Sequence, residues 1–234
     1  MARREDRLKQ LADRLEESYK VDCRAICCDV SKTEECKRLI KEMDGFDIEV
    51  FINNAGFGDC SPFIKGDLQK ELDMVDVNIK AVHTLTKLVL QKMQGADKGY
   101  VLNIASSAGL IPAGPYMATY YATKAYVTSL TQAVARELKE AKSNIYIGCV
   151  CPGPVDTEFN SVANVEFALP GITAGYCAQY SLKKMFQKKT VIVPTLVMKL
   201  ALFAIRLLPR KWYIAITAKQ QKKKICTKEE RALS

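Results

Sequence analysis

A tyrosine and a lysine four residues apart, Tyr120 and Lys124, lie in a stretch whose hydrophobic pattern predicts an uninterrupted helix. Residues spaced by four share a helix face, so this helix would present a phenol and an ammonium side by side. A neighbouring cation favours the phenolate and draws the pKa of a tyrosine down from about 10. The pair is therefore a candidate general acid or base, although the spacing alone is common in helices.

Other polar residues are expected close to this pair. Ser107 lies 13 residues before Tyr120 (120 − 107 = 13) and directly follows a predicted strand. The sequence Asn-Asn-Ala-Gly at 53–56 ends an earlier strand, Asn78 lies within a predicted helix, and residues 151–157 follow a later strand. Ligands bind at the carboxyl ends of the strands in parallel sheets, so these segments are expected to converge on one edge.

The elements that must position these residues alternate along the chain. A helix that begins close to residue 1 precedes the first predicted strand, and a capping box of Ser31 and Glu34 is expected to open the next helix. This alternation predicts one α/β domain over residues 1–234, a doubly wound parallel sheet with helices on both faces. The expected helices are 4–19, a helix after residue 31, 67–94 and 120–142, and the expected strands are 23–30, 48–56, 99–107 and 144–154.

These motifs together resemble the classical short-chain dehydrogenases/reductases, from residue 1 to about residue 160. The resemblance implies a Rossmann-like fold and hydride transfer between a nicotinamide and a carbonyl or secondary alcohol. It implies that Tyr120 transfers the proton and that Ser107 hydrogen-bonds the same substrate oxygen. By the same resemblance, Lys124 lowers the pKa of the tyrosine and holds the nicotinamide ribose, while Asn78 supports a water that links the lysine to solvent.

The resemblance also implies residues that bind the cofactor. Asp29 and Val30 match the pair beside the adenine ring, and Arg3 and Arg4 fall where arginine pairs with the 2′-phosphate of NADP. NADP is therefore expected rather than NAD; the alternative is that the two arginines simply open an exposed helix. Asn53, Ala55 and Gly56 match the Asn-Asn-Ala-Gly element of the family, and Pro152, Gly153 and Thr157 match the stretch that lines the nicotinamide. Together with Tyr120 and Lys124, these residues are expected to bind the cofactor.

The sequence departs from the family at its N-terminus. The first strand, the glycine-rich turn of the Thr-Gly-x-x-x-Gly-x-Gly kind, the first helix and the second strand of the family have no counterpart. That turn places the pyrophosphate at a helix N-terminus, and the missing strands would leave the strand 48–56 with a bare edge. The expectation is a domain truncated at its N-terminus, either because the natural product is longer or because a short product exists that binds its cofactor poorly.

The C-terminal third is expected to cover the substrate. Residues 155–190 break the alternation and are predicted to form a substrate-covering region, and 191–234 are predicted to form an apolar helix and a basic tail. Pro194, Lys199 and Arg206 interrupt the apolar segment 191–209, which argues against a spanning helix and for a short strand plus a helix that faces the core or another subunit. A peripheral contact with anionic lipid stays open. The apolar character favours a lipophilic substrate.

Composition excludes several other classes. The formal charge of +9 comes without a recognisable nucleic-acid motif, so no nucleic-acid partner is expected. Nine scattered cysteines, an odd number, and the lack of a secretory signal favour reduced thiols and a cytoplasmic protein. His83 is the single histidine, so neither a multi-histidine metal site nor a serine hydrolase with a Gly-x-Ser-x-Gly turn is expected.

Two functional classes remain. The first is an NADP-dependent oxidoreductase, which the resemblance implies to be a homo-oligomer that contacts its copies through the helices 67–94 and 120–142. The second is a non-catalytic remnant that binds a membrane or a partner through residues 196–224.

Overall fold

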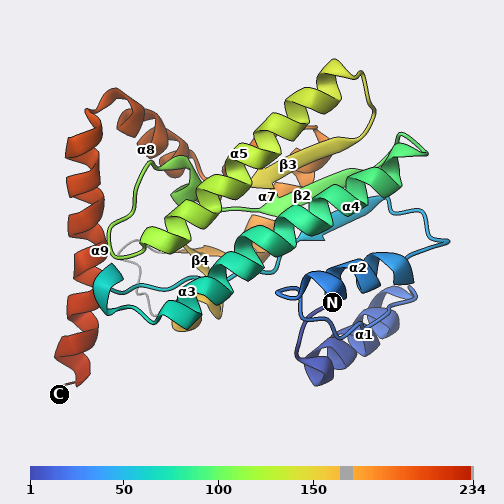
Figure 1. Cartoon of the computed structure of the whole chain (residues 1–234), viewed down its shortest axis with the longest axis horizontal. Coiled ribbons are helices and arrows are strands. Elements are labelled where there is room, and N and C mark those ends of the chain that lie inside the picture. Colours follow the sequence, from blue (N-terminus) through green and yellow to red (C-terminus); the bar gives the residue numbers. More distant parts are fainter. Residues whose placement is uncertain (164–170, 233–234) are drawn as a thin grey trace.

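The computed structural model describes residues 1–163 and 171–232 (Figure 1). Parts of the predicted regions 155–190 and 191–234 therefore lie outside the described residues, namely 164–170 and 233–234. The elements in chain order are α1 (Glu5–Tyr19), α2 (Thr33–Glu42), β1 (Val50–Asn53), η1 (Phe63–Lys65), α3 (Leu68–Val75), η2 (Asp76–Ala81), α4 (Val82–Gln94), β2 (Tyr100–Ile104), η3 (Ser107–Leu110), α5 (Ala118–Glu140), β3 (Tyr146–Val150), β4 (Val155–Asp156), α6 (Phe159–Val162), β5 (Ile172–Thr173), α7 (Ala174–Phe186), β6 (Val191–Ile192), α8 (Leu196–Leu207) and α9 (Arg210–Ala232).

The main sheet has four parallel strands in the order β1-β2-β3-β6. Val50 pairs with Tyr100, and Leu102 pairs with Gly148. Each crossover between neighbouring strands contains a helix, as parallel strands require. A short parallel pair, β4 with β5, lies outside this sheet. The predicted α/β fold with a parallel sheet is confirmed.

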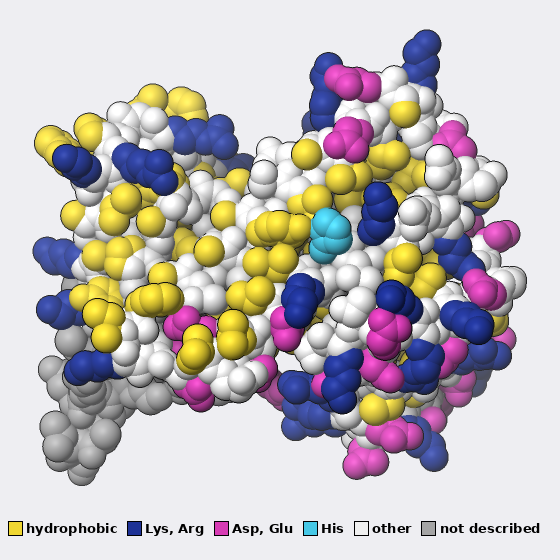
Figure 2. All heavy atoms as spheres, in the orientation of Figure 1, with side chains coloured by type: hydrophobic (Ala, Val, Ile, Leu, Met, Phe, Trp, Pro, Cys, Tyr) yellow, Lys and Arg dark blue, Asp and Glu magenta, His cyan; other side chains and the backbone are white. Residues whose placement is uncertain are grey.

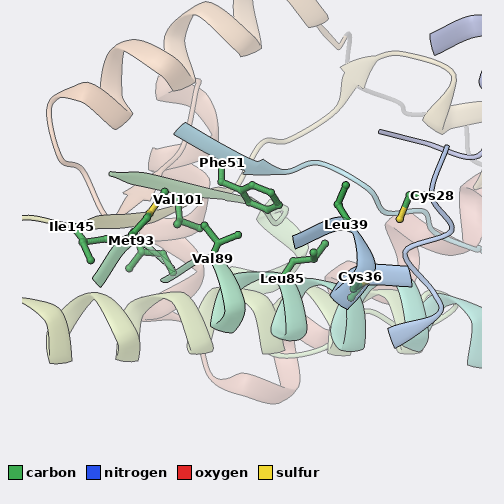
Figure 3. Packing of buried hydrophobic residues seen from close by; sticks show 11 residues of the cluster. Cys28, Cys36, Leu39, Phe51, Leu85, Val89, Met93, Val101 and Ile145 are labelled. Carbon is green, nitrogen blue, oxygen red and sulfur yellow. The ribbon is translucent and has the colours of Figure 1, made fainter. Parts of the chain in front are cut away.

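Strand alternation distributes the core over both faces of the sheet. Phe51, Val101 and Ile147 point to one face, which α2, α4 and α5 cover, and Leu102 and Val150 point to the other face beneath α7. Figure 3 shows residues from α2, β1 and α4 meeting in the first cluster. Each large side chain buried in this way contributes about 1.5–3 kcal/mol of transfer free energy. The sheet is thus wound with helices on both faces, as predicted.

The predicted helix 67–94 forms with one irregularity. Asp67 caps it, because its carboxylate accepts hydrogen bonds from the backbone amides of Gln69 and Lys70. Between α3 and α4 the chain takes a π-helical turn, η2, from Asp76 to Ala81. The sequence pattern gives no signal for this turn, which places Asn78 in the core.

Two expectations near the N-terminus are wrong. Residues 23–30 do not form a strand, since Cys27 makes only an isolated parallel bridge to Ala2. A strand needs a neighbour with a continuous ladder, and the single bond from the amide of Cys28 to the carbonyl of Ala2 does not supply one. The capping box is also absent, because the Ser31 hydroxyl donates to Asp29 at 2.7 Å rather than capping α2.

The segment 191–209 forms a short strand, β6, followed by α8, as predicted. Within the part of the chain that the structure describes, no helix is long and apolar enough to cross a membrane. At the other end of the sheet, β1 is an edge strand whose Val50 and Ile52 side chains are exposed.

Candidate active site

A cavity of about 510 Å³ opens at the carboxyl ends of β1, β2 and β3. The strand ends form its base, α5 forms one wall, and α7 and α9 contribute further residues. The structure therefore brings segments that are far apart in the sequence to one edge of the sheet, as the parallel topology requires. The predicted residues that line the cavity are Gly56, Ser107, Tyr120, Lys124, Pro152, Gly153 and Thr157.

Tyr120 is buried near the start of α5, and its phenol lies close to the hydroxyl of Ser106. Burial raises the pKa of Tyr120 to about 12, and the nearby hydroxyl of Ser106 opposes that shift. At neutral pH the phenol is therefore protonated. It can act as a proton donor to an oxygen placed in the cavity.

The serine hydroxyl close to Tyr120 is that of Ser106, whereas the sequence prediction selected Ser107. Ser106 has extended backbone and caps η3 by accepting a hydrogen bond from the amide of Ala108, so its hydroxyl stands at the end of β2. Ser107 begins η3, and its amide donates to the carbonyl of Pro152 at 2.8 Å. Both serines line the cavity. Sequence spacing alone does not separate two adjacent serines; the backbone direction after β2 does.

Lys124 lies one helical turn after Tyr120, and its Nζ donates to the carbonyl of Ile104 at 2.9 Å. Its Nζ lies 5.9 Å from the centre of the Tyr120 ring. Burial lowers the pKa of Lys124 to about 8. The predicted lowering of the tyrosine pKa by this lysine is not what the structure shows, because desolvation of the phenol dominates and raises that pKa.

Asn78 lies in the π-helical turn and is fully buried. Its side-chain oxygen accepts from the amide of Phe57 at 3.1 Å, and its side-chain nitrogen donates to the carbonyl of Phe57 at 2.9 Å. The same nitrogen donates to the hydroxyl of Thr123 at 3.1 Å, next to Lys124. Asn78 thus fastens the loop after β1 to the active-site helix and acts as a positioning residue in this structure.

Within the sequence Asn-Asn-Ala-Gly the two asparagines have different surroundings. The side chain of Asn53 points into the core, where it donates to Asn103 at 2.8 Å and to Thr86 at 3.1 Å. Asn54, which the sequence interpretation did not select, lines the cavity instead. Ala55 is exposed and does not line it. The side chain of Asn53 therefore points away from the cavity, and neither Asn53 nor Ala55 lines it.

Gly56 provides a test of whether a cofactor fits here. A Cβ atom at this position would lie 3.0 Å from Oδ1 of Asn78 and 3.2 Å from Nζ of Lys124, so only glycine leaves the lysine head accessible. Across the cavity, Pro152, Gly153 and Thr157 follow β3. The ammonium of Lys124 and the accessible backbone at Gly56 suit the ribose of a nicotinamide nucleotide. The small residues after β3 leave room for the nicotinamide ring. The described residues therefore fit the nicotinamide half of such a cofactor.

The four residues predicted at the adenosine end lie outside this cavity. Arg4 forms an ion pair with Glu158 at 3.2 Å, and the backbone carbonyl of Arg3 accepts from the thiol of Cys27. Asp29 accepts from both the amide and the hydroxyl of Ser31, which lowers its pKa. The carbonyl of Val30 accepts from Cys36. The structure thus does not bring these residues to Tyr120.

One contact near the site had no signal in the sequence. Gln221, from the last helix, donates from its side-chain nitrogen to the phenol of Tyr121 at 2.8 Å. Tyr121 and Gln221 both line the cavity. Pairing residues 100 positions apart depends on how α9 packs, and a local pattern does not report that. Among the described residues there is no group of three or more His, Cys, Asp or Glu side chains that could hold a metal ion.

The model of the family described as short chain dehydrogenase matches residues 1–166. The chain belongs to this family. The very-long-chain 3-oxoacyl-CoA reductase of Anas platyrhynchos is 33% identical over 175 residues, which cover 73% of this chain and 55% of that protein. The dehydrogenase/reductase SDR family member 11 of Gallus gallus is 36% identical over 138 residues, 56% of this chain and 54% of that protein. The chain thus spans about half the length of the curated relatives it matches.

Solved structures agree with this fold. A short-chain dehydrogenase from Sphingobium yanoikuyae, in complex with NADPH, has a TM-score of 0.76 and 26% identity, covering 83% of this chain and 76% of its own. A 7beta-hydroxysteroid dehydrogenase has a TM-score of 0.81 and 20% identity, covering 92% and 84%. Short-chain dehydrogenases are oxidoreductases that use a nicotinamide cofactor, and the geometry at Tyr120 and Lys124 suits that chemistry.

Proposed function

We propose that this chain is an NADP-dependent oxidoreductase that transfers a hydride between the nicotinamide and a carbonyl or secondary alcohol of a lipophilic substrate. The observation that carries the proposal is the meeting of Ser106, Tyr120 and Lys124 at one cavity, with the tyrosine phenol close to the serine hydroxyl. None of the three makes a strong site alone. Together they place a proton donor, an oxygen-binding hydroxyl and a cation at one cavity.

In the direction of reduction, the protonated phenol of Tyr120 donates its proton to the substrate oxygen, and Ser106 holds that oxygen by a hydrogen bond. Lys124, whose Nζ stands beside Gly56, would bind the ribose hydroxyls and orient the ring. The bound cofactor supplies the hydride. Asn78 holds the loop that carries Gly56 against the active-site helix through its bonds to Phe57 and Thr123.

The cavity lining supports a lipophilic substrate. Phe159, Ala174, Ala178 and Leu182 from α6 and α7 face the cavity together with the strand ends. A mostly apolar wall with few polar groups is typical of sites for extended apolar ligands. The relative from Anas platyrhynchos is named for very-long-chain 3-oxoacyl-CoA. We propose 3-oxoacyl compounds as the substrate class to test first.

Arg4 supports NADP as the cofactor. Its ion pair with Glu158 joins two side chains that are both mostly exposed, so the pair is weak and a phosphate dianion could compete for the guanidinium. Solved relatives include one in complex with NADPH and one in complex with NAD, so the family alone does not choose. An Arg4→Ala variant should weaken NADPH binding and leave NADH binding unchanged.

The proposal also includes a cytoplasmic homo-oligomer. His83 of α4 and Tyr126 of α5 are hydrogen-bonded at 2.7 Å on the exposed side of these helices, which run side by side in Figure 1. Size-exclusion chromatography with light scattering tests the assembly, and cell fractionation tests the location. A monomer at micromolar concentration would contradict the first of these.

Two measurements test the function itself. Saturation with NADPH at about 100 times its dissociation constant should stabilise the fold by about 2.7 kcal/mol, a rise in Tm of about 5–10 °C for a chain of this length. NADPH oxidation should then depend on an added 3-oxoacyl thioester. If NADPH causes no rise in Tm and no substrate-dependent oxidation of NADPH is observed, the proposal is wrong. A rise in Tm without turnover would reject only the substrate class.

A further inference from the structure

Helix α8 is apolar on two opposite faces. Leu202 is buried against the body of the protein, and Met198 packs beside it. The other face carries four large apolar side chains at spacings of four, three and four, which form a continuous stripe. Their exposed fractions are 69% for Leu196, 61% for Leu200, 64% for Phe203 and 73% for Leu207. A helix of a soluble domain normally turns polar residues to this side, so the stripe needs an explanation.

The start of α9 also exposes large apolar side chains. Tyr213 and Thr217 turn inward and are buried, whereas Trp212 and Ile216, one residue earlier in each case, are exposed. We call the set of exposed apolar residues Leu196, Leu200, Phe203, Leu207, Trp212 and Ile216 the apolar stripe. Tryptophan is enriched where proteins meet the boundary between lipid and water, because its ring is apolar and its N–H is polar.

The segment that contains α7, α8 and the start of α9 carries charge of one sign. Residues 171–222 contain no Asp or Glu, so nothing within this segment neutralises its cations. Figure 2 shows basic and apolar side chains interspersed at the end of the molecule where α8 and α9 lie. The ten cations of this segment are Lys183, Lys184, Lys188, Lys189, Lys199, Arg206, Arg210, Lys211, Lys219 and Lys222.

We infer that the apolar stripe docks this protein onto the surface of a bilayer that contains anionic lipid. Helix α8 has 12 residues and is therefore about 18 Å long, too short for a hydrocarbon core of about 30 Å. It lies along the interface with its apolar side chains inserted, and the cations contact lipid headgroups. This placement uses both the apolar stripe and the unbalanced charge.

The charge pattern favours a bilayer over a second copy of the chain. A two-fold contact would place the same surface opposite itself. Lys199, Arg206, Arg210 and Lys211 belong to the same two helices as the stripe, so two copies would bring like charges together without acidic partners from this segment. Anionic headgroups remove that repulsion.

The docked helices are also in contact with the active-site cavity. Met198 of α8 lies against Gly153, where an added Cβ would be 2.5 Å from its Cε atom. Gln221 of α9 holds Tyr121. A protein docked through α8 and α9 therefore holds its cavity next to the lipid from which an apolar substrate would come.

Co-sedimentation of the full chain with vesicles tests this inference. Vesicles of phosphatidylcholine with 30% phosphatidylserine are compared with vesicles of phosphatidylcholine alone. We expect binding to the anionic vesicles that falls at least tenfold in the double variant Leu200→Gln/Phe203→Gln. The double variant Arg206→Gln/Arg210→Gln should lower the affinity about fivefold for each cation removed. Tyr19→Gln/Val21→Gln, which removes two exposed apolar side chains at the opposite end of the molecule, is the matched control and should bind like the wild type.

Circular dichroism and Tm verify that each variant is folded, which is expected because every substituted side chain is exposed. Equal binding to neutral and anionic vesicles, or equal losses in the stripe variant and the control, would overturn the inference. So would a wild-type chain that binds no vesicles and forms a dimer that Leu200→Gln/Phe203→Gln converts to a monomer. That result would assign the apolar stripe to a second copy.

Discussion

The Nζ atom of Lys124 lies 2.9 Å from the carbonyl oxygen of Ile104, the last residue of β2. This bond ties the active-site helix to the central sheet at the level of the cavity. It also holds an ammonium in a buried position, where desolvation disfavours the charged form and lowers the pKa of the lysine to about 8. Burial has the opposite effect on Tyr120, whose pKa rises to about 12.

Stability should therefore increase with pH above about 8 because of Lys124. Between its folded pKa of about 8 and its ordinary value of 10.5, the unfolded chain binds more protons than the folded chain, so the free energy of unfolding rises with pH. Lys124→Met should remove that rise, because methionine does not titrate. Urea unfolding at pH 7, 8 and 9 measures it.

The control for this pH effect is Lys139→Met, at an exposed position of the same helix, which should leave the slope against pH unchanged. A rise with pH that persists in Lys124→Met would show that another group causes it.

Tyr120→Phe should remove the proton donor and lower kcat about 10²–10⁴-fold, with NADPH binding retained. The matched control is Tyr121→Phe, the neighbouring tyrosine, whose phenol accepts a hydrogen bond from Gln221. It should affect kcat far less. Steady-state NADPH oxidation and a Tm titration measure both properties, and equal kcat values for the two variants would contradict the assignment of Tyr120.

Adjacent serines give a second test. Ser106→Ala should lower kcat about 10²–10³-fold, the usual cost of losing a donor to a reacting oxygen. Ser107→Ala should have a small effect, since the bond that fixes this residue is made by its backbone amide to Pro152. If Ser107→Ala is the more damaging substitution, the assignment from sequence spacing is right and the structural one is wrong.

Asn53, the last residue of β1, and Asn54, which follows it, should have different effects on stability and on cofactor binding. Asn53→Ala leaves the buried side chain of Asn103 without one partner and should destabilise the fold by about 1–3 kcal/mol. Asn54→Ala should leave Tm unchanged and raise the KM for NADPH, because Asn54 lines the cavity and is exposed. Thermal unfolding and kinetics on both variants decide this, and the reverse pattern would place Asn53 at the cofactor.

Gly56→Ala should displace the head of Lys124, because the new Cβ would lie 3.2 Å from Nζ. We expect a rise in the KM for NADPH of about tenfold or more, equivalent to a loss of at least 1.4 kcal/mol. Gly95→Ala, where an added Cβ has no neighbour within 4 Å, is the control and should bind NADPH normally. A Gly56→Ala enzyme with unaltered KM would remove the argument from close approach.

Much of the fold could be predicted because local sequence patterns determine most of its helices and strands. The spacing of apolar residues gave α1, and the apolar runs gave β1 to β3, each near its expected bounds. The strand 23–30 was wrong because its composition suits a strand while no neighbouring ladder forms. A strand depends on a partner that a local pattern does not report.

The site could be predicted less well, and for the same reason. Tyr120 and Lys124 are set by helix periodicity, so their shared cavity follows from sequence alone. The choice of Ser106 depends on backbone direction after β2, and the inward turn of Asn53 depends on polar partners in β2 and α4. Neither the raised pKa of Tyr120 nor the contact from Gln221 follows from spacing, because both arise from tertiary burial.

The π-helical turn from Asp76 to Ala81 makes the position of Asn78 in the site depend on the number of residues in this helix. A π-helical turn accommodates one residue more than regular α-helical winding, so deleting one residue there would let α3 continue into α4 as a regular helix. Met74 and Leu85 would keep facing the interior, whereas Asn78 would leave its place beside Phe57. A single-residue deletion in this turn should therefore disturb the loop that carries Gly56 more than the packing of the two helices.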